Sequence, residues 1–158
     1  MSLKVLLDTG FLIALTNRND PDHQVAKEYY ELLNNRSVEI YLSTIVASEF
    51  AVKQTIEDLP LEDWLPLSFN LPHSVKAGKF KSALFASREK SDQRDVVAND
   101  ISILAQAAHE QIPIILSRDK NTMHRWCGKL NDAQLCNITC VLLKDGFHPK
   151  SLGLSGDQ

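Results

Sequence analysis

Short apolar runs along the chain alternate with longer segments in which apolar residues recur at helical spacing. The short runs are typical of buried strands, and we expect strands over residues 3–7, 38–42, 67–71, 112–116 and 138–142. The longer segments predict helices over residues 10–16, 20–34, 44–56, 72–87, 95–109 and 121–130. Strands that alternate with helices favour an α/β fold in which helices cover both faces of a mostly parallel sheet.

Three local patterns refine these expectations. Asp20 followed by Pro21 resembles a helix N-cap with Pro at the first helical position. Residues 67–71 alternate between apolar and polar side chains and follow a Pro-containing stretch, which favours an edge strand. Residues 95–109 are apolar on more than one side, as in a helix packed between two layers.

The composition changes this picture little. With 158 residues, 44% of them apolar and 23% charged, the chain fits one globular domain, which we place at residues 1–145 with a loose C-terminal tail over 146–158. The sequence shows neither a secretory pattern nor an apolar stretch near the roughly 18 residues of a membrane span. We therefore expect a cytoplasmic protein without a membrane segment, in which Cys127, Cys136 and Cys140 are reduced thiols.

Four carboxylates occupy positions that suggest chemistry. Asp8 follows the first expected strand and Asp119 follows the fourth, so parallel strands would bring both to the same edge of the sheet. Glu49 lies in the second turn of the helix that leaves the second strand, near that same edge. Asp100 shares a helix face with apolar residues, where an unpaired charge is costly.

Acids that converge at one edge raise one another's pKa, and burial adds to the effect. A hard divalent cation removes this conflict, and Mg²⁺ or Mn²⁺ suits carboxylate oxygens and water. Four carboxylates leave room for two such ions, the arrangement that stabilises both oxygens of phosphodiester hydrolysis. Two divalent ions would add four positive charges and change the net charge of the chain from −3 to +1.

Each acid also has a structural alternative. Asp8 could only cap the following helix, Asp119 could cap its own helix or pair with Lys120 or Arg125, and Glu49 could bond Lys53. Asp100 is the hardest of the four to explain in this way. If all four acids were structural, the chain would be a non-catalytic α/β binding module.

At these four acids the sequence resembles PIN-domain nucleases of the small VapC-like kind, the toxin halves of toxin–antitoxin pairs. The matching segments are LLDTGFLI at 6–13, LSTIVASEF at 42–50, NDISILAQAA at 99–108 and IILSRD at 114–119. Each segment is weak evidence, but their order and spacing together are fairly specific. The resemblance extends from about residue 3 to residue 142.

The resemblance implies a three-layer α/β/α sandwich, a homodimer, a possible protein antitoxin, and Mg²⁺- or Mn²⁺-dependent endonucleolytic cleavage of RNA. The reaction it implies is in-line attack by water, which leaves 5′-phosphate and 3′-hydroxyl ends. A nuclease of this class acting on DNA is the alternative. By the same resemblance, the catalytic metal site consists of Asp8, Glu49, Asp100 and Asp119, supported by the hydroxyls of Thr9 and Ser117.

The sequence departs from the family pattern at two positions. Gly10 stands where a Ser or Asn is frequent, two residues after the first Asp, which removes one supporting hydrogen bond. Asn121 stands where some members carry a further acid.

Other polar and aromatic residues admit two readings. Two basic groups could bind an RNA backbone or form ordinary solvated faces; they are Lys76, Lys79, Lys81, Arg88, Lys90 and Arg94, and Arg118, Lys120, Arg125 and Lys129. Trp64 and Trp126 could stack on bases, although core packing explains them more simply. A zinc site could be drawn from His124 and the three cysteines, but their spacing does not match the usual paired ligands.

Overall fold

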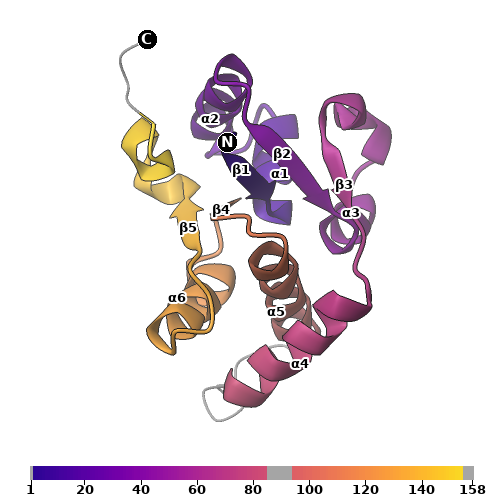
Figure 1. Cartoon of the computed structure of the whole chain (residues 1–158). Helices are drawn as coiled ribbons and strands as arrows, with labels where there is room; N and C mark the ends of the chain where they lie inside the picture. Colours follow the sequence, from indigo (N-terminus) through magenta and orange to yellow (C-terminus); the bar gives the residue numbers. More distant parts are fainter. Residues whose placement is uncertain (1, 85–93, 155–158) are drawn as a thin grey trace.

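The computed structural model describes residues 2–84 and 94–154 and shows a parallel sheet flanked by helices (Figure 1). Its main elements are β1 (Lys4–Leu7), α1 (Thr9–Thr16), α2 (His23–Asn35), β2 (Glu39–Ser43), α3 (Thr44–Ala51), β3 (Leu65–Leu67), α4 (Leu71–Leu84), α5 (Arg94–His109), β4 (Ile114–Ser117), α6 (Arg125–Asp132) and β5 (Thr139–Leu142). The expected alternation of strands and helices is confirmed. No helix in the described ranges is long and apolar enough to cross a membrane.

All five strands run parallel in the order β3-β2-β1-β4-β5. Leu7 of β1 pairs with Leu116 of β4, and the backbone N–H of Asp8 extends the ladder by donating to the Leu116 carbonyl at 2.9 Å. The chain proceeds outward from β1 in one direction through β2 and β3, then returns to β4 on the other side. The gap between the ends of β1 and β4 is therefore the switch point at which such sheets bind ligands.

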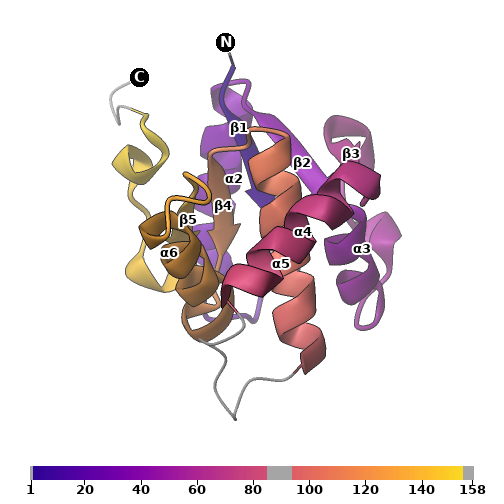
Figure 2. The ribbon, with the colours of Figure 1, turned by 60° about the horizontal axis from the view of Figure 1, so that its bottom comes forward.

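Helices cover both faces of the sheet, as Figure 2 shows with α2 behind the strands and α5 and α6 in front. The helix α4 lies across the outer side of α5, so α5 is enclosed between α4 and the sheet. This explains why α5 is apolar on several sides, with Ile103, Leu104, Ala105 and Ala107 all fully buried. The three-layer α/β/α sandwich and the packed fifth helix are thus confirmed.

The edge strand lies earlier than its alternating pattern suggests. The structure places β3 at Leu65–Leu67 and begins α4 at Leu71, so the expected strand over 67–71 is wrong except at its first residue. Pro66 is tolerated because β3 is an edge strand, where one side needs no N–H donor. The Asn70 side chain accepts a hydrogen bond from the His73 N–H, which favours a helix start over a longer strand.

The start of α2 also differs from the sequence expectation. The helix begins at His23, and Asp22 rather than Asp20 is its N-cap residue. The Asp20 carboxylate is used elsewhere, because one oxygen accepts from the Asp22 N–H at 2.9 Å and the other binds Arg118 at 2.7 Å. The interpretation of Asp20-Pro21 as the helix start is therefore wrong.

Two further boundaries were only partly anticipated. The helix expected over 121–130 is a π-helical turn at Lys120–His124 that continues into α6. The helix expected over 72–87 is seen as α4 up to Leu84, and residues 85–87 lie outside the described part of the chain.

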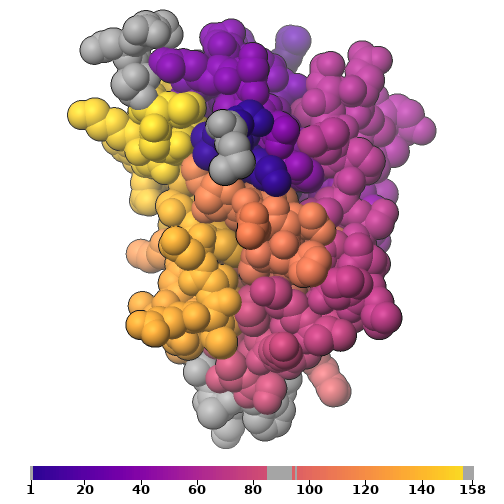
Figure 3. Space-filling view, viewed as in Figure 1, coloured from indigo at the N-terminus to yellow at the C-terminus, as the bar shows by residue number. Residues whose placement is uncertain are grey.

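The residues between β5 and residue 154 pack against the rest of the protein. Phe147 packs edge-on against Tyr29 of α2 at a centroid distance of 4.9 Å, and Leu152 is buried. The Tyr29 hydroxyl donates to the Gly146 carbonyl at 3.2 Å and accepts from the His148 N–H at 3.0 Å. Figure 3 shows these C-terminal residues, in yellow, packed beside the purple surface of α2.

Candidate functional site

Asp8 is the most completely engaged of the four acids. It lies directly after β1, is 2% exposed, and caps α1 through a hydrogen bond from the Thr9 N–H to Oδ1 at 2.8 Å. Its second oxygen, Oδ2, accepts from the Ser117 hydroxyl at 2.7 Å. The capping role is therefore real, but it uses only one oxygen and leaves the other facing the end of β4.

Two hydroxyls connect the remaining acids at this edge. The Ser117 hydroxyl that donates to Asp8 also accepts from the Asp119 N–H at 3.2 Å, which fixes the backbone of Asp119 beside Asp8. The Thr9 hydroxyl donates to Glu49 Oε1 at 3.0 Å and ties the second turn of α3 to the start of α1. Glu49 is half-buried, whereas Asp119 is exposed.

Asp100 is the one acid with an unsatisfied atom. It projects from the buried part of α5, is 5% exposed, and its Oδ2 has no hydrogen-bond partner. A hydrogen bond with the Thr122 side chain, in the π-helical turn after Asp119, stabilises its charged form in part. A buried carboxylate oxygen without a partner is costly unless a cation or a proton satisfies it.

The charges of the four acids interact. Burial raises the pKa of Asp8 to about 6, with further increases from the charges of Asp119 and Glu49 and decreases from the hydrogen bonds of Ser117 and Thr9. Burial also raises the pKa of Asp100 to about 8, and the neighbouring charge of Asp8 is the next cause. The structure thus gathers Asp8, Glu49, Asp100 and Asp119 at one edge of the sheet.

The donor set at this edge fits a hard divalent cation. All the side-chain atoms it offers are oxygens, one of them buried and unpartnered, and the two buried acids gain most from a positive charge. In the described residues no three of these carboxylates bring oxygens within 4.8 Å of one another. Mg²⁺ and Mn²⁺ are commonly held by only one or two carboxylates together with several waters, so this spacing still suits them.

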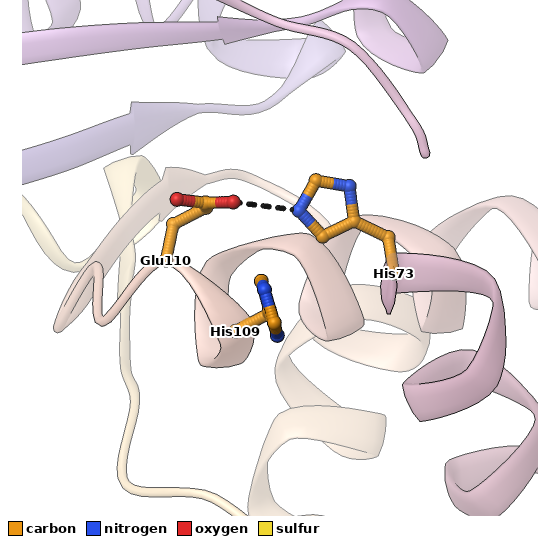
Figure 4. A group of neighbouring side chains, drawn as sticks. All are labelled: His73, His109 and Glu110. Atoms are coloured by element: carbon orange, nitrogen blue, oxygen red, sulfur yellow. Dashed lines mark hydrogen bonds and ion pairs between the residues drawn. The ribbon is translucent and has the colours of Figure 1, made fainter. Parts of the chain in front are cut away.

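A second group of possible ligands lies at the opposite end of α5 (Figure 4). His73, His109 and Glu110 are the only three His, Cys, Asp or Glu side chains of the described residues whose donor atoms fall within 4.8 Å of one another. His73 is fully buried; its Nδ1 accepts from the Asn70 N–H at 3.1 Å, so its Nε2 carries the proton and donates to Glu110 at 2.8 Å. This tautomer uses both nitrogens and ties α4 to α5 without a metal.

Arg118 forms an ion pair with the loop before α2. Its guanidinium donates to Asp20 Oδ2 at 2.7 Å and lies 3.9 Å from Asp22, and the Asp20 side chain is only 7% exposed. Although burial acts in the opposite direction, hydrogen bonds from Arg118 and Asp22 lower the pKa of Asp20. Arg118 therefore binds the loop before α2, and this ion pair fixes the orientation of Arg118 directly before Asp119 in the chain.

Gly10 makes room for that arginine. A Cβ at Gly10 would lie 2.7 Å from Cγ of Arg118, closer than real contacts allow. The departure from Ser or Asn at this position therefore has a steric cause, because the stem of Arg118 occupies the space of a larger side chain.

Three contributions to the site escape sequence analysis. Thr122 bonds Asp100 from a π-helical turn that no hydrophobic period predicts, and Asp20 reaches Arg118 across 98 positions. Gln106 is fully buried and accepts from the Ser43 hydroxyl at 2.5 Å, while its amide donates to the Leu67 carbonyl at 3.1 Å. Its place six residues after Asp100 in an apolar helix is the only signal that could have indicated it.

The cysteines and the two tryptophans are packed in the protein interior or partly buried. Cys127 donates to the Ile138 carbonyl at 3.2 Å, and burial raises its pKa to about 12 and that of Cys140 higher still. Among the described residues, no group of three possible ligands that includes a cysteine has its donor atoms within 4.8 Å of one another, so the zinc alternative gains no support. Trp64 and Trp126 are buried, as core packing predicts, whereas Arg88 and Lys90 of the basic group lie outside the described residues.

Comparison with known proteins identifies the family. A profile of the PIN domain family matches residues 5–128, and the chain belongs to this family. No curated protein sequence matches it.

Solved structures with a similar fold include VapBC2 from Rickettsia felis bound to a DNA fragment from its promoter (17% identity, TM-score 0.59, covering 78% of this chain and 92% of that one). FitAcB from Neisseria gonorrhoeae is 16% identical, with a TM-score of 0.58, and the match covers 89% of this chain and 98% of that one. The sarcin-ricin-loop-cleaving toxin VapC20 from Mycobacterium tuberculosis is 16% identical, with a TM-score of 0.53, and the match covers 74% of this chain and 91% of that one. At these identities the likeness establishes the fold alone.

The raised pKa of Asp100 predicts how the stability of the metal-free protein depends on pH. The unfolded carboxyl ionises near 3.8, whereas folded Asp100 keeps its proton to about 8, so stability is lost as pH rises between these values. We expect Asp100→Asn to remove this loss. The difference in unfolding free energy between the variant and the wild type should grow from pH 5 to 8, by at most about 1.4 kcal/mol per pH unit. Urea titrations in EDTA measure it, and parallel pH profiles would contradict it.

The contact between Gly10 and Arg118 predicts an unusual cost for a Gly→Ala change in a helix. Gly10→Ala should lower the unfolding free energy by about 1–2 kcal/mol, because the clash outweighs the gain in helix propensity. Gly78→Ala, at an open position of α4, is the matched control and should stabilise by up to about 1 kcal/mol. In an Arg118→Ala background the cost of Gly10→Ala should vanish, and a persistent cost would refute the contact.

Proposed function

We propose that this PIN-domain protein is a divalent-metal-dependent endoribonuclease whose site consists of Asp8, Glu49, Asp100 and Asp119. The observation that carries the proposal is the unpartnered, buried Oδ2 of Asp100, coupled by charge to Asp8 at the switch point of the sheet. A pair of buried carboxylates with raised pKa values is unfavourable without a cation. The same pair is a ready-made site for Mg²⁺ or Mn²⁺.

The chain's own residues orient the acids. Ser117 and the Thr9 N–H direct the two oxygens of Asp8, the Thr9 hydroxyl directs Glu49, and the Ser117 hydroxyl receives the Asp119 N–H. A divalent ion bound there supplies the positive charge that activates water and stabilises the phosphate in phosphodiester hydrolysis. Burial of Asp8 and Asp100 keeps bulk water from screening that charge.

The substrate is RNA in this proposal, as the resemblance to VapC-like nucleases implies, and DNA is the alternative substrate. The VapC20 structure is described as a sarcin-ricin-loop-cleaving toxin, and two structural neighbours are DNA-bound VapBC structures. We infer that this chain is likewise a toxin-type nuclease that acts in the cytoplasm as a homodimer, inhibited by a protein antitoxin. The three free cysteines are consistent with a reducing compartment.

Removal of one buried acid should abolish cleavage. Asp8→Asn and Asp100→Asn should each lower Mn²⁺-dependent cutting of single-stranded RNA by at least about 100-fold, because each removes a buried cation ligand. Asp63→Asn changes an exposed acid in the loop before β3 and should cut like the wild type. Gel assays on RNA and on DNA of the same sequence measure both rates. Undiminished cutting by both site variants would refute the assignment, and faster cutting of DNA would refute the substrate.

Metal binding should stabilise the fold. An ion at 100 times its dissociation constant adds roughly 2.7 kcal/mol to the unfolding free energy. We expect that gain for the wild type with Mn²⁺ and a much smaller gain for Asp100→Asn in thermal melts at pH 7. An equal gain in unfolding free energy for the wild type and Asp100→Asn would mean that the ion binds elsewhere. No gain for either protein would favour a non-catalytic binding module.

A further inference from the structure

A pocket of about 250 Å³ opens where the end of α4, the first turns of α5 and the start of α6 meet. These three helices also converge in Figure 2. Five of its seven lining residues are apolar and the other two are cations; the lining residues are Lys81, Leu84, Arg94, Val97, Ala98, Ile101 and Trp126. None of these described lining residues is acidic.

The pocket and the acidic site use neighbouring residues of α5. Val97 and Ile101 line the pocket and flank Asp100 in sequence, three residues before it and one residue after it. From the other side, Trp126 lies four residues after Thr122, whose side chain bonds Asp100. One helical turn rises about 5.4 Å, so the backbone positions of Val97 and Ile101 lie within one turn of Asp100 along the axis of α5.

The chemistry of the pocket matches one ligand class. The apolar lining residues suit a base, and the two exposed lining cations, Lys81 and Arg94, attract the phosphates on either side of that base. An apolar protein side chain would fill the pocket equally well but would leave Lys81 and Arg94 without anionic partners. The volume is near the lower end of small-ligand pockets and suits one nucleotide rather than a peptide helix.

We propose that this pocket holds the base of a single-stranded RNA nucleotide next to the phosphate that is cut, with Lys81 and Arg94 on the adjoining phosphates. The assignment rests on the proposed ribonuclease function and adds to it a determinant of where the RNA is cleaved. The acids set the chemistry, whereas the pocket selects one base beside the cut.

Filling the pocket tests the proposal. Ala98→Phe places a ring in the pocket, and Ala98→Leu is a smaller filling in case the first variant is unstable in thermal melts. Ala108→Phe is the matched control, because Ala108 lies 10 residues further along α5 and lines a separate pocket of about 270 Å³. Binding is measured by fluorescence anisotropy with a labelled random RNA hexamer, in an Asp8→Asn background that prevents cleavage.

The filled pocket should weaken RNA binding about tenfold, the change expected for one lost base contact, while Ala108→Phe binds like its parent. Lys81→Gln and Arg94→Gln should each reduce the slope of log affinity against log salt by about 0.7. In otherwise wild-type protein, sequencing of cut ends from random RNA should show that Ala98→Phe loses the preference at one position beside the cut.

Unchanged hexamer binding and an unchanged base preference in both Ala98 variants would overturn the proposal and leave a protein side chain as the occupant. Failure of the wild-type chain to cut any RNA would instead refute the ribonuclease function. The two failures are therefore distinguishable, because the first requires an active wild-type enzyme.

Discussion

The burial of two carboxylates at the sheet edge is the constraint on which this structure depends. Asp8 and Asp100 are nearly inaccessible to water, which raises the pKa of both, and the charge of Asp8 raises the pKa of Asp100 further. A chain selected for stability alone would replace such a pair with apolar residues. The protein retains it at the switch point of a parallel sheet, where such sheets bind ligands, and we interpret the cost of burying these charges as affinity for a cation.

The surrounding fold keeps that arrangement in place. Ser117 bridges the ends of β1 and β4 by contacting Asp8 and the Asp119 backbone. The distance between these two neighbouring strands therefore sets the distance between the two acids. Further out, Arg118 crosses over Gly10 to reach Asp20 and fastens the loop before α2 to the same edge. The site is therefore built on rigid elements, with its most exposed acid, Asp119, held through its neighbours.

The sequence predicts the elements that depend on local pattern. Apolar strands followed by Asp8 and Asp119 indicate the acidic edge, because strand ends converge in any parallel sheet. Prediction fails where the deciding contact is distant in sequence. The sequence around Asp20 resembles a helix cap, but its carboxylate binds Arg118 instead. The strand expected over 67–71 does not form, because the Asn70 side chain accepts from the His73 N–H at the start of a helix. Thr122 could not be foreseen, because a π-helical turn leaves no hydrophobic period.

The most direct test of this account is a crystal structure of the protein soaked with Mn²⁺, with the ions located by anomalous scattering. The account predicts one or two peaks between Asp8 and Asp100, within coordination distance of their carboxylate oxygens. Peaks confined to the group of His73, His109 and Glu110, or no peak near the end of β1 at saturating Mn²⁺, would contradict it.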